Sequence, residues 1–138
     1  MTDKKAIQLA KRVEFWQKQL SGLGVGHWRI EQVSCVNEVP GAQGSLAGVF
    51  PSGQYASATF WFQNEHIDNS TPREVDETIV HEWLHVVMRD LDAALDSVDE
   101  HLAPAVEEMW KSRVTHEREA LVDMLARDIV DKYYAAKQ

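Results

Sequence analysis

The sequence predicts an α+β fold in which one helix precedes, and further helices follow, a small three-stranded sheet. Apolar residues recur at helical spacing in the first and last parts of the chain, whereas in the middle they alternate or cluster between turn signals. The chain has 138 residues, which is the length of one domain, so residues 1–138 are predicted to form a single unit. We expect a mainly antiparallel sheet because two of its strands form a hairpin.

The N-terminal helix is predicted over residues 2–20, whose apolar side chains line one face, and Gly22 follows as a stop signal. The first strand is predicted over residues 28–36, where imperfect alternation indicates a bulge. Residues 45–50 and 55–63 are predicted to form the hairpin, and the turn between them contains proline and glycine.

A second helix is predicted to begin after Thr71, the N-cap of a capping box with Glu74, and Pro72 takes the first helical position. Its apolar face continues to Leu91. Residues 90–100 are acidic, and we expect them to form a loop.

The last helical segment is predicted from Pro104 to about Ala136. Thr115 is a candidate second N-cap, which would divide the segment in two.

Residues 81–85 read His-Glu-x-x-His within the predicted second helix. Residues four apart share one helix face, so the imidazoles of His81 and His85 can reach one metal ion with Glu82 beside it. Two neutral nitrogen ligands, an open coordination position and a nearby carboxylate suit the activation of water for attack. The motif predicts a Zn²⁺ site with His81 and His85 as ligands and Glu82 as the catalytic base. The alternative is two partly exposed histidines beside a solvated glutamate.

A third protein ligand must come from another segment, because catalytic zinc ions typically have three. The metzincin extension fails, since its glycine and third histidine positions hold methionine and leucine. Glu119 is followed four residues later by Asp123 on the same predicted helix face. We expect Glu119 to bind the metal and Asp123 to accept a hydrogen bond from the distal nitrogen of a ligand histidine. Glu107 and Glu117 remain alternatives to Glu119.

The pair of motifs His81-Glu82-x-x-His85 and Glu119-Ala-x-x-Asp123 resembles the gluzincin class of zinc metallopeptidases, which includes thermolysin. The resemblance implies a zincin-like fold, in a short single-domain form similar to those of bacteria and phages. It implies zinc binding by the two histidines and Glu119, a general base at Glu82 and an orienting carboxylate at Asp123. The implied activity is cleavage of peptide bonds in a peptide or protein substrate.

A substrate peptide is expected to pair with the strand at residues 55–63, if that strand is a sheet edge. Strand residues that face away from the apolar side, and polar residues of the last helix, are the candidates for substrate binding and oxyanion support. These candidates are Thr59, Trp61, His116 and Tyr133.

The composition excludes several other classes of function. The formal net charge is −8, from 22 acidic and 14 basic residues, and no basic stripe appears that would bind nucleic acid or an anionic membrane surface. No segment reaches transmembrane length. Cys35 is the only cysteine, and with no signal peptide in view it predicts a reducing, cytoplasmic location.

Two other functions remain open at the level of sequence. The first is a non-catalytic, zincin-like binding or regulatory module in which zinc is structural. The second is a metal-free adaptor that uses the apolar face of the hairpin.

Overall fold

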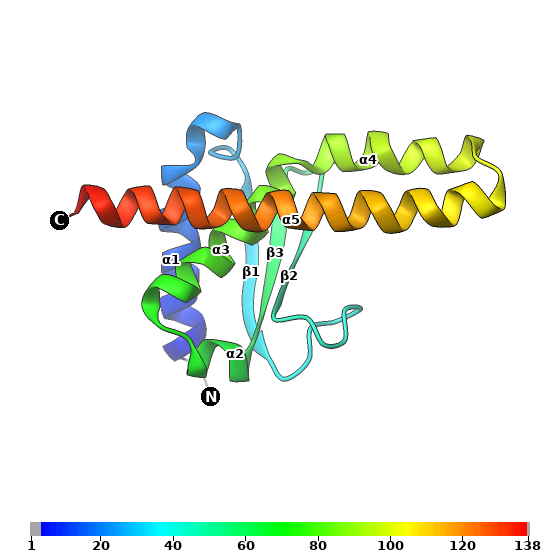
Figure 1. Cartoon of the computed structure of the whole chain (residues 1–138). Coiled ribbons are helices and arrows are strands. Elements are labelled where there is room, and N and C mark those ends of the chain that lie inside the picture. Colours follow the sequence, from blue (N-terminus) through cyan, green and yellow to red (C-terminus); the bar gives the residue numbers. More distant parts are fainter. Residues whose placement is uncertain (1–3, 138) are drawn as a thin grey trace.

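The structure is a computed structural model that describes residues 4–137. It has an α+β fold, as predicted, with one helix before the sheet and the other helices after it (Figure 1). The elements in chain order are α1 (Lys4–Gln19), β1 (Arg29–Val36), β2 (Ala47–Ser52), β3 (Ser57–Gln63), α2 (Asn64–Asn69), α3 (Pro72–Val87), α4 (Arg89–Val98) and α5 (Pro104–Ala136). Short 3-10 turns follow α1 and α4, at Ser21–Leu23 and Asp99–His101.

The sheet has the order β1-β3-β2, so β3 is its central strand. The predicted hairpin of β2 and β3 is antiparallel, and the predicted bulge in β1 is present as a register shift between Ile30 and Gln32. The expectation of a mainly antiparallel sheet is wrong, because β1 runs parallel to β3. Alternation within a strand shows which face is buried but not which way its neighbour runs.

The core lies between one face of the sheet and the helices α1 and α3. Phe60 and Phe62 of β3 are fully buried, and the ring of Phe60 lies 4.9 Å from that of Trp83 on α3. The indole Nε1 of Trp83 donates a hydrogen bond of 3.0 Å to the carbonyl of Val13 on α1. This packing fixes the rotation of α3 about its own axis, and so decides which of its residues face away from the core.

Helix α3 begins as predicted: the hydroxyl of Thr71 accepts a hydrogen bond from the amide of Glu74, and the Glu74 carboxylate accepts one from the amide of Thr71. The predicted loop at residues 90–100 is wrong, because α4 occupies most of that range. The acidic residues there do not prevent a helix, since apolar residues still recur at helical spacing and Asp92 pairs with Arg118.

Helix α5 is continuous, so the predicted division at Thr115 does not occur. No glycine or proline lies in this part of the chain, and a single threonine does not end a helix by itself. Helix α2 was not predicted. None of the helices in the described part of the chain has the length and apolar character needed to cross a membrane.

Helices α3 and α5 lie side by side and run antiparallel (Figure 1). Arg73 near the start of α3 pairs with Asp131 near the end of α5. One turn after another along α3, His81 meets Asp123 and His85 meets Glu119. Beyond these contacts, α4 and the first half of α5 project together past the sheet. We call α4 and residues 104–118 the helical arm.

Candidate metal centre

His81 and His85 lie on α3 at the border between the buried and the open face, with side chains 20% and 22% exposed. The preceding and intervening apolar residues, Val80, Trp83 and Leu84, are buried and hold this face of the helix in place. The imidazoles line a cleft of about 950 Å³ between β2 on one side and α3 and α5 on the other. That volume is within the usual range for ligand sites.

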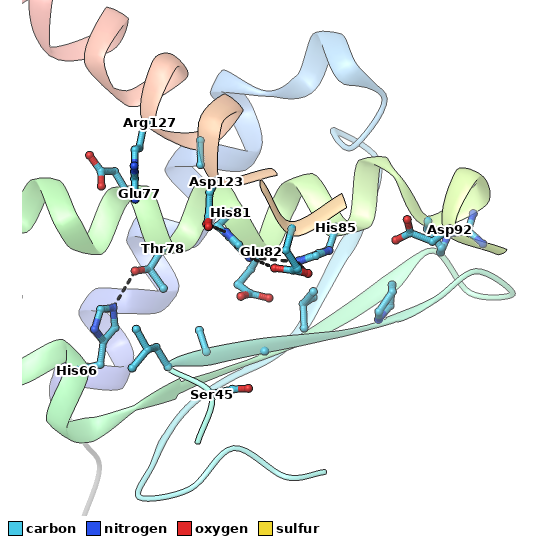
Figure 2. A pocket seen from close by; sticks show the side chains of 18 of the residues that line it. Ser45, His66, Glu77, Thr78, His81, Glu82, His85, Asp92, Asp123 and Arg127 are labelled. Atoms are coloured by element: carbon cyan, nitrogen blue, oxygen red, sulfur yellow. Dashed lines mark hydrogen bonds and ion pairs between the residues drawn. The ribbon is translucent and has the colours of Figure 1, made fainter. Parts of the chain in front are cut away.

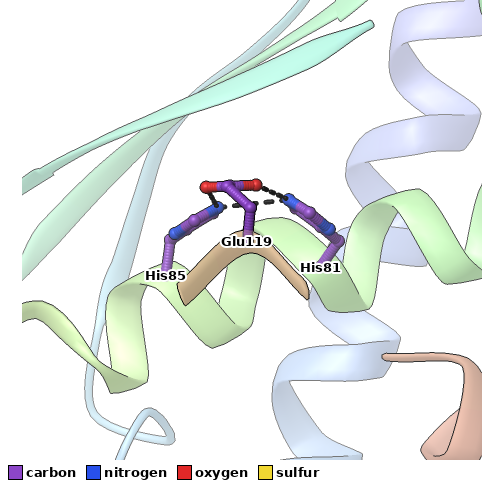
Figure 3. A group of neighbouring side chains, drawn as sticks. All are labelled: His81, His85 and Glu119. Atoms are coloured by element: carbon purple, nitrogen blue, oxygen red, sulfur yellow. Dashed lines mark hydrogen bonds and ion pairs between the residues drawn. The ribbon is translucent and has the colours of Figure 1, made fainter. Parts of the chain in front are cut away.

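The structure brings Glu119 of α5 to both imidazoles (Figure 3). The Nε2 atoms of His81 and His85 lie 3.1 Å apart. The two carboxylate oxygens of Glu119 lie 3.3 Å from Nε2 of His81 and 3.2 Å from Nε2 of His85. Two helices thus present the ligand atoms of three residues to one small volume. The other candidate third ligands, Glu107 and Glu117, instead pair with Lys111 and Arg113 on the exposed surface of α5.

These separations fit a shared cation. Two N or O ligands bound tetrahedrally to one zinc ion lie roughly 3.3–3.5 Å apart. The two imidazole nitrogens are 3.1 Å apart, and each lies 3.2 or 3.3 Å from a different oxygen of Glu119, at or just below that value. Two imidazoles and one carboxylate are also the donor set that zinc accepts in catalytic sites. The residues therefore suit Zn²⁺, and the binding of zinc stays a prediction.

Asp123 lies one turn after Glu119 on α5, and its Oδ1 is 2.8 Å from Nδ1 of His81 (Figure 2). This places the carboxylate at the ring nitrogen that faces away from the other imidazole. A proton on Nδ1, donated to Asp123, leaves the Nε2 lone pair of His81 directed at the shared volume. The position is the one expected from the Glu-x-x-x-Asp spacing.

The protonation of His85 also suits metal binding. Burial lowers the pKa of His85, although the negative charge of Glu119 acts in the opposite direction. A lowered pKa favours the neutral ring, which is the form that binds a metal.

Glu82 is only 6% exposed and points from α3 into the cleft (Figure 2). Burial, with the charge of Glu119 as a second cause, raises the pKa of Glu82 to about 8. A carboxyl group with this pKa is mostly protonated at neutral pH, whereas a base must be ionised. The role of base expected for Glu82 therefore requires the positive charge of a bound metal ion, which would lower this pKa.

The floor of the cleft is formed by β2 rather than β3. Cleft-lining residues of β2 include Ala47, Val49 and Pro51. Because β3 is the central strand, the condition under which a peptide was expected to pair with residues 55–63 is not met. The edge strand that lines the cleft is β2.

Four residues predicted to bind substrate lie elsewhere. Thr59 and Trp61 are on the sheet face opposite Phe60, where Trp61 packs edge-on against Phe50 at 4.7 Å. The ring of Tyr133 packs among the aromatic side chains of α1, 5.1 Å from Trp16. His116 is exposed and lies in a shallow hollow of α5 next to the cleft. The structure brings none of the four into the cleft.

Other residues line the cleft that the sequence did not single out. His66 lines one end, where its Nε2 is 2.8 Å from the hydroxyl of Thr78. Arg89 and Asp92 of α4 line the other end. His66 comes from a segment with no predicted helix, so no helical periodicity pointed to its placement.

The chain was compared with known proteins at three levels. No family model, no curated protein and no solved structure matches it. The argument for function therefore rests on the chemistry and geometry of these residues.

Proposed function

We propose that this chain is a zinc-dependent hydrolase, and specifically a metallopeptidase of the gluzincin type. The observation that carries the proposal is the convergence of His81, His85 and Glu119 beside the buried carboxyl group of Glu82, with the nearest ligand atoms of each pair of these three residues 3.1–3.3 Å apart. A chance helical pair of histidines explains neither a carboxylate from a distant helix at both rings nor a second carboxylate on the distal nitrogen of His81.

In this proposal each residue has one task. A bound zinc ion would supply Lewis acidity, which activates water and polarises a carbonyl group. His81, His85 and Glu119 hold the ion, and Asp123 keeps the ring of His81 in the required tautomer. Glu82 accepts the proton of the attacking water on its carboxylate and returns it to the leaving amine.

The outer edge of β2 is suited to hold an extended peptide. The amide of Gln63 donates to the carbonyl of Leu46, at 2.9 Å, so the main-chain groups of Leu46 point toward β3. In an antiparallel pair the direction alternates, and Ala47 and Val49 therefore point their N–H and C=O groups outward. Pro51 also points outward but has no N–H to offer. A substrate strand would thus be held mainly by Ala47 and Val49, beside the metal centre.

The test compares Glu82→Gln with wild type for zinc content and for cleavage of an unstructured protein such as denatured casein. The variant keeps all three ligands, so it should bind one zinc ion per chain while its turnover falls at least about 100-fold. Glu77→Gln is the matched control, because Glu77 is another cleft-lining carboxylate on α3. Unchanged turnover in Glu82→Gln would rule out the assigned base.

A structural role for zinc is the second candidate. Its supporting observation is that the ligands come from two helices, so that one ion would cross-link α3 to α5. This role predicts a large loss of thermal stability on chelation and no hydrolysis of any peptide in a broad library.

A further inference from the structure

The two helices of the arm are joined by charge next to the metal centre. Nη1 of Arg118 on α5 lies 3.3 Å from Oδ1 of Asp92 and 3.7 Å from Oδ1 of Asp96, both on α4. The side chains of Arg118 and Asp92 are mostly buried, at 18% and 23% exposure. Nη1 of Arg118 and Oδ1 of Asp92 are themselves buried and form no hydrogen bond of good geometry. The link therefore depends on charge rather than on directional bonding.

This link sits between the two parts of the candidate site. Arg118 immediately precedes Glu119, and Asp92 lines the same cleft as His85. Burial lowers the pKa of His85, and the nearer charges of Glu119 and His81 also act on it. The charge of Asp92 raises this pKa and the charge of Arg118 lowers it. The ion pair is thus close enough to act on the environment of one ligand and is covalently next to another.

The fully buried residues of α5 are all on the other side of Glu119. The buried residues of α5 are Val122, Ala126 and Val130, all C-terminal to Glu119. On its N-terminal side, Arg118 supplies an ion-pair link to α4. Glu119 therefore lies at the point where the fully buried part of α5 gives way to the arm.

We propose that Arg118 and Asp92 are positioning residues that hold α5 against the end of α3, so that the carboxylate of Glu119 stays over His81 and His85. The inference rests on the proposed metal site and adds to it a reason why the site stays assembled. Removing Arg118 takes from the largely buried Asp92 the cation with which it pairs, a situation that proteins avoid by rearranging. The rearrangement available here is movement of the arm away from the cleft, which carries Glu119 off its ligand position.

The experiment measures zinc affinity by competition with a chromophoric chelator, together with hydrogen exchange of the α4 amides in the zinc-free protein. Arg118→Ala should weaken zinc binding at least about tenfold and speed exchange in α4 by a similar factor. Arg118→Lys should retain most of the affinity, because the link needs a positive charge but no particular hydrogen-bond geometry. The double variant Asp92→Arg with Arg118→Asp should recover affinity relative to either single charge reversal.

Arg113→Ala is the matched control, because Arg113 is an exposed arginine of α5 that pairs with Glu117 on the same helix. It should change neither zinc affinity nor α4 exchange.

Wild-type zinc affinity in Arg118→Ala would overturn the inference while leaving the metal site intact. If wild type binds no zinc, the proposed function fails, and α4 exchange in Arg118→Ala still decides whether the link holds the arm. If fast hydrogen exchange in β3 shows that Arg118→Ala is unfolded, Arg118→Lys and the double charge reversal decide the question. Loss of zinc affinity in both of these variants would overturn the inference.

Discussion

Nδ1 of His81 and Oδ1 of Asp123 lie 2.8 Å apart, which joins α3 to α5 on the outer side of the candidate metal centre. A carboxylate in this position fixes the ring and its tautomer and raises the basicity of the nitrogen that binds the metal. Asp123→Ala should therefore weaken zinc binding about 10–100-fold without removing a ligand. Competition with a chelator of known affinity measures the change.

Asp128→Ala provides the control for that prediction, since Asp128 is another carboxylate of α5, engaged on the surface with Lys132. It should leave zinc affinity unchanged. Equal affinities for Asp123→Ala and wild type would show that the hydrogen bond to His81 does not orient a ligand.

The outward N–H of Val49 provides a second prediction, which concerns substrate binding. Val49→Pro removes this donor, and the edge position tolerates proline because the N–H does not bond to β3. Loss of one main-chain hydrogen bond should lower kcat/KM for a peptide about two- to tenfold, chiefly through KM. Steady-state kinetics with a fluorogenic peptide measure the effect.

Val49→Ala separates the lost donor from the lost side chain, because it shortens the side chain but keeps the N–H. A peptide analogue with an ester in place of the amide that meets the carbonyl of Val49 tests the complementary bond. Should Val49→Pro and Val49→Ala have the same kcat/KM, β2 would not be the strand that holds the substrate.

The placement of the site residues followed from spacing, because a helix converts spacing directly into geometry. His81 and His85 share a face of α3, and Glu119 and Asp123 share a face of α5, since residues four apart always do. The antiparallel contact of the two helices then needs only one correct register to bring all four side chains together. The sequence favoured that register because two imidazoles and two carboxylates together can bind a metal ion and orient one of its ligands.

The remaining features depend on relationships between segments that local patterns do not encode. The parallel direction of β1 and the edge position of β2 are properties of the whole sheet. The acidic α4 is stabilised by a partner from another helix, Arg118, whose approach no local pattern predicts. Thr59 and Trp61 were placed on the correct strand. The other face of that strand is buried, and Thr59 and Trp61 lie on the face of the sheet opposite it.

Zinc removal provides a third prediction, which concerns stability. A ligand that binds the folded chain but not the unfolded chain stabilises it by about 2.7 kcal/mol at a free concentration 100 times its Kd. Chelation of wild type should lower the melting temperature by several degrees, and calorimetry with and without chelator measures this. The double variant His81→Ala with His85→Ala should show no shift on chelation. A shift that persists in that variant would place the stabilising ion elsewhere in the chain.

The last prediction concerns acid stability and the contact network of Asp76. This carboxylate is 1% exposed and accepts hydrogen bonds from the guanidinium of Arg12 at 2.6 and 2.8 Å, from the indole of Trp16 at 2.9 Å and from the hydroxyl of Tyr134 at 2.5 Å. The network ties α1, α3 and α5 together. Burial raises the pKa of Asp76, but the hydrogen bonds from Arg12, Tyr134 and Trp16 together outweigh it, and the net pKa is lowered from 3.8.

A lowered pKa means that the unfolded chain binds the proton of Asp76 more tightly than the folded chain does. The stability that this group contributes is therefore fully present above pH 3.8 and is lost as the pH falls through the lower value of the folded state. Asp76→Asn should be less stable than wild type at pH 7 by about 3 kcal/mol, because Arg12 loses its counter-ion, and the difference should shrink as the pH falls below 3.8. Urea unfolding at a series of pH values measures both.

Asp68→Asn is the control, because it removes the exposed partner of Lys5 and should change stability little at any pH. A difference between Asp76→Asn and wild type that stays constant down to the lowest pH would mean that the charge of Asp76 does not stabilise the fold.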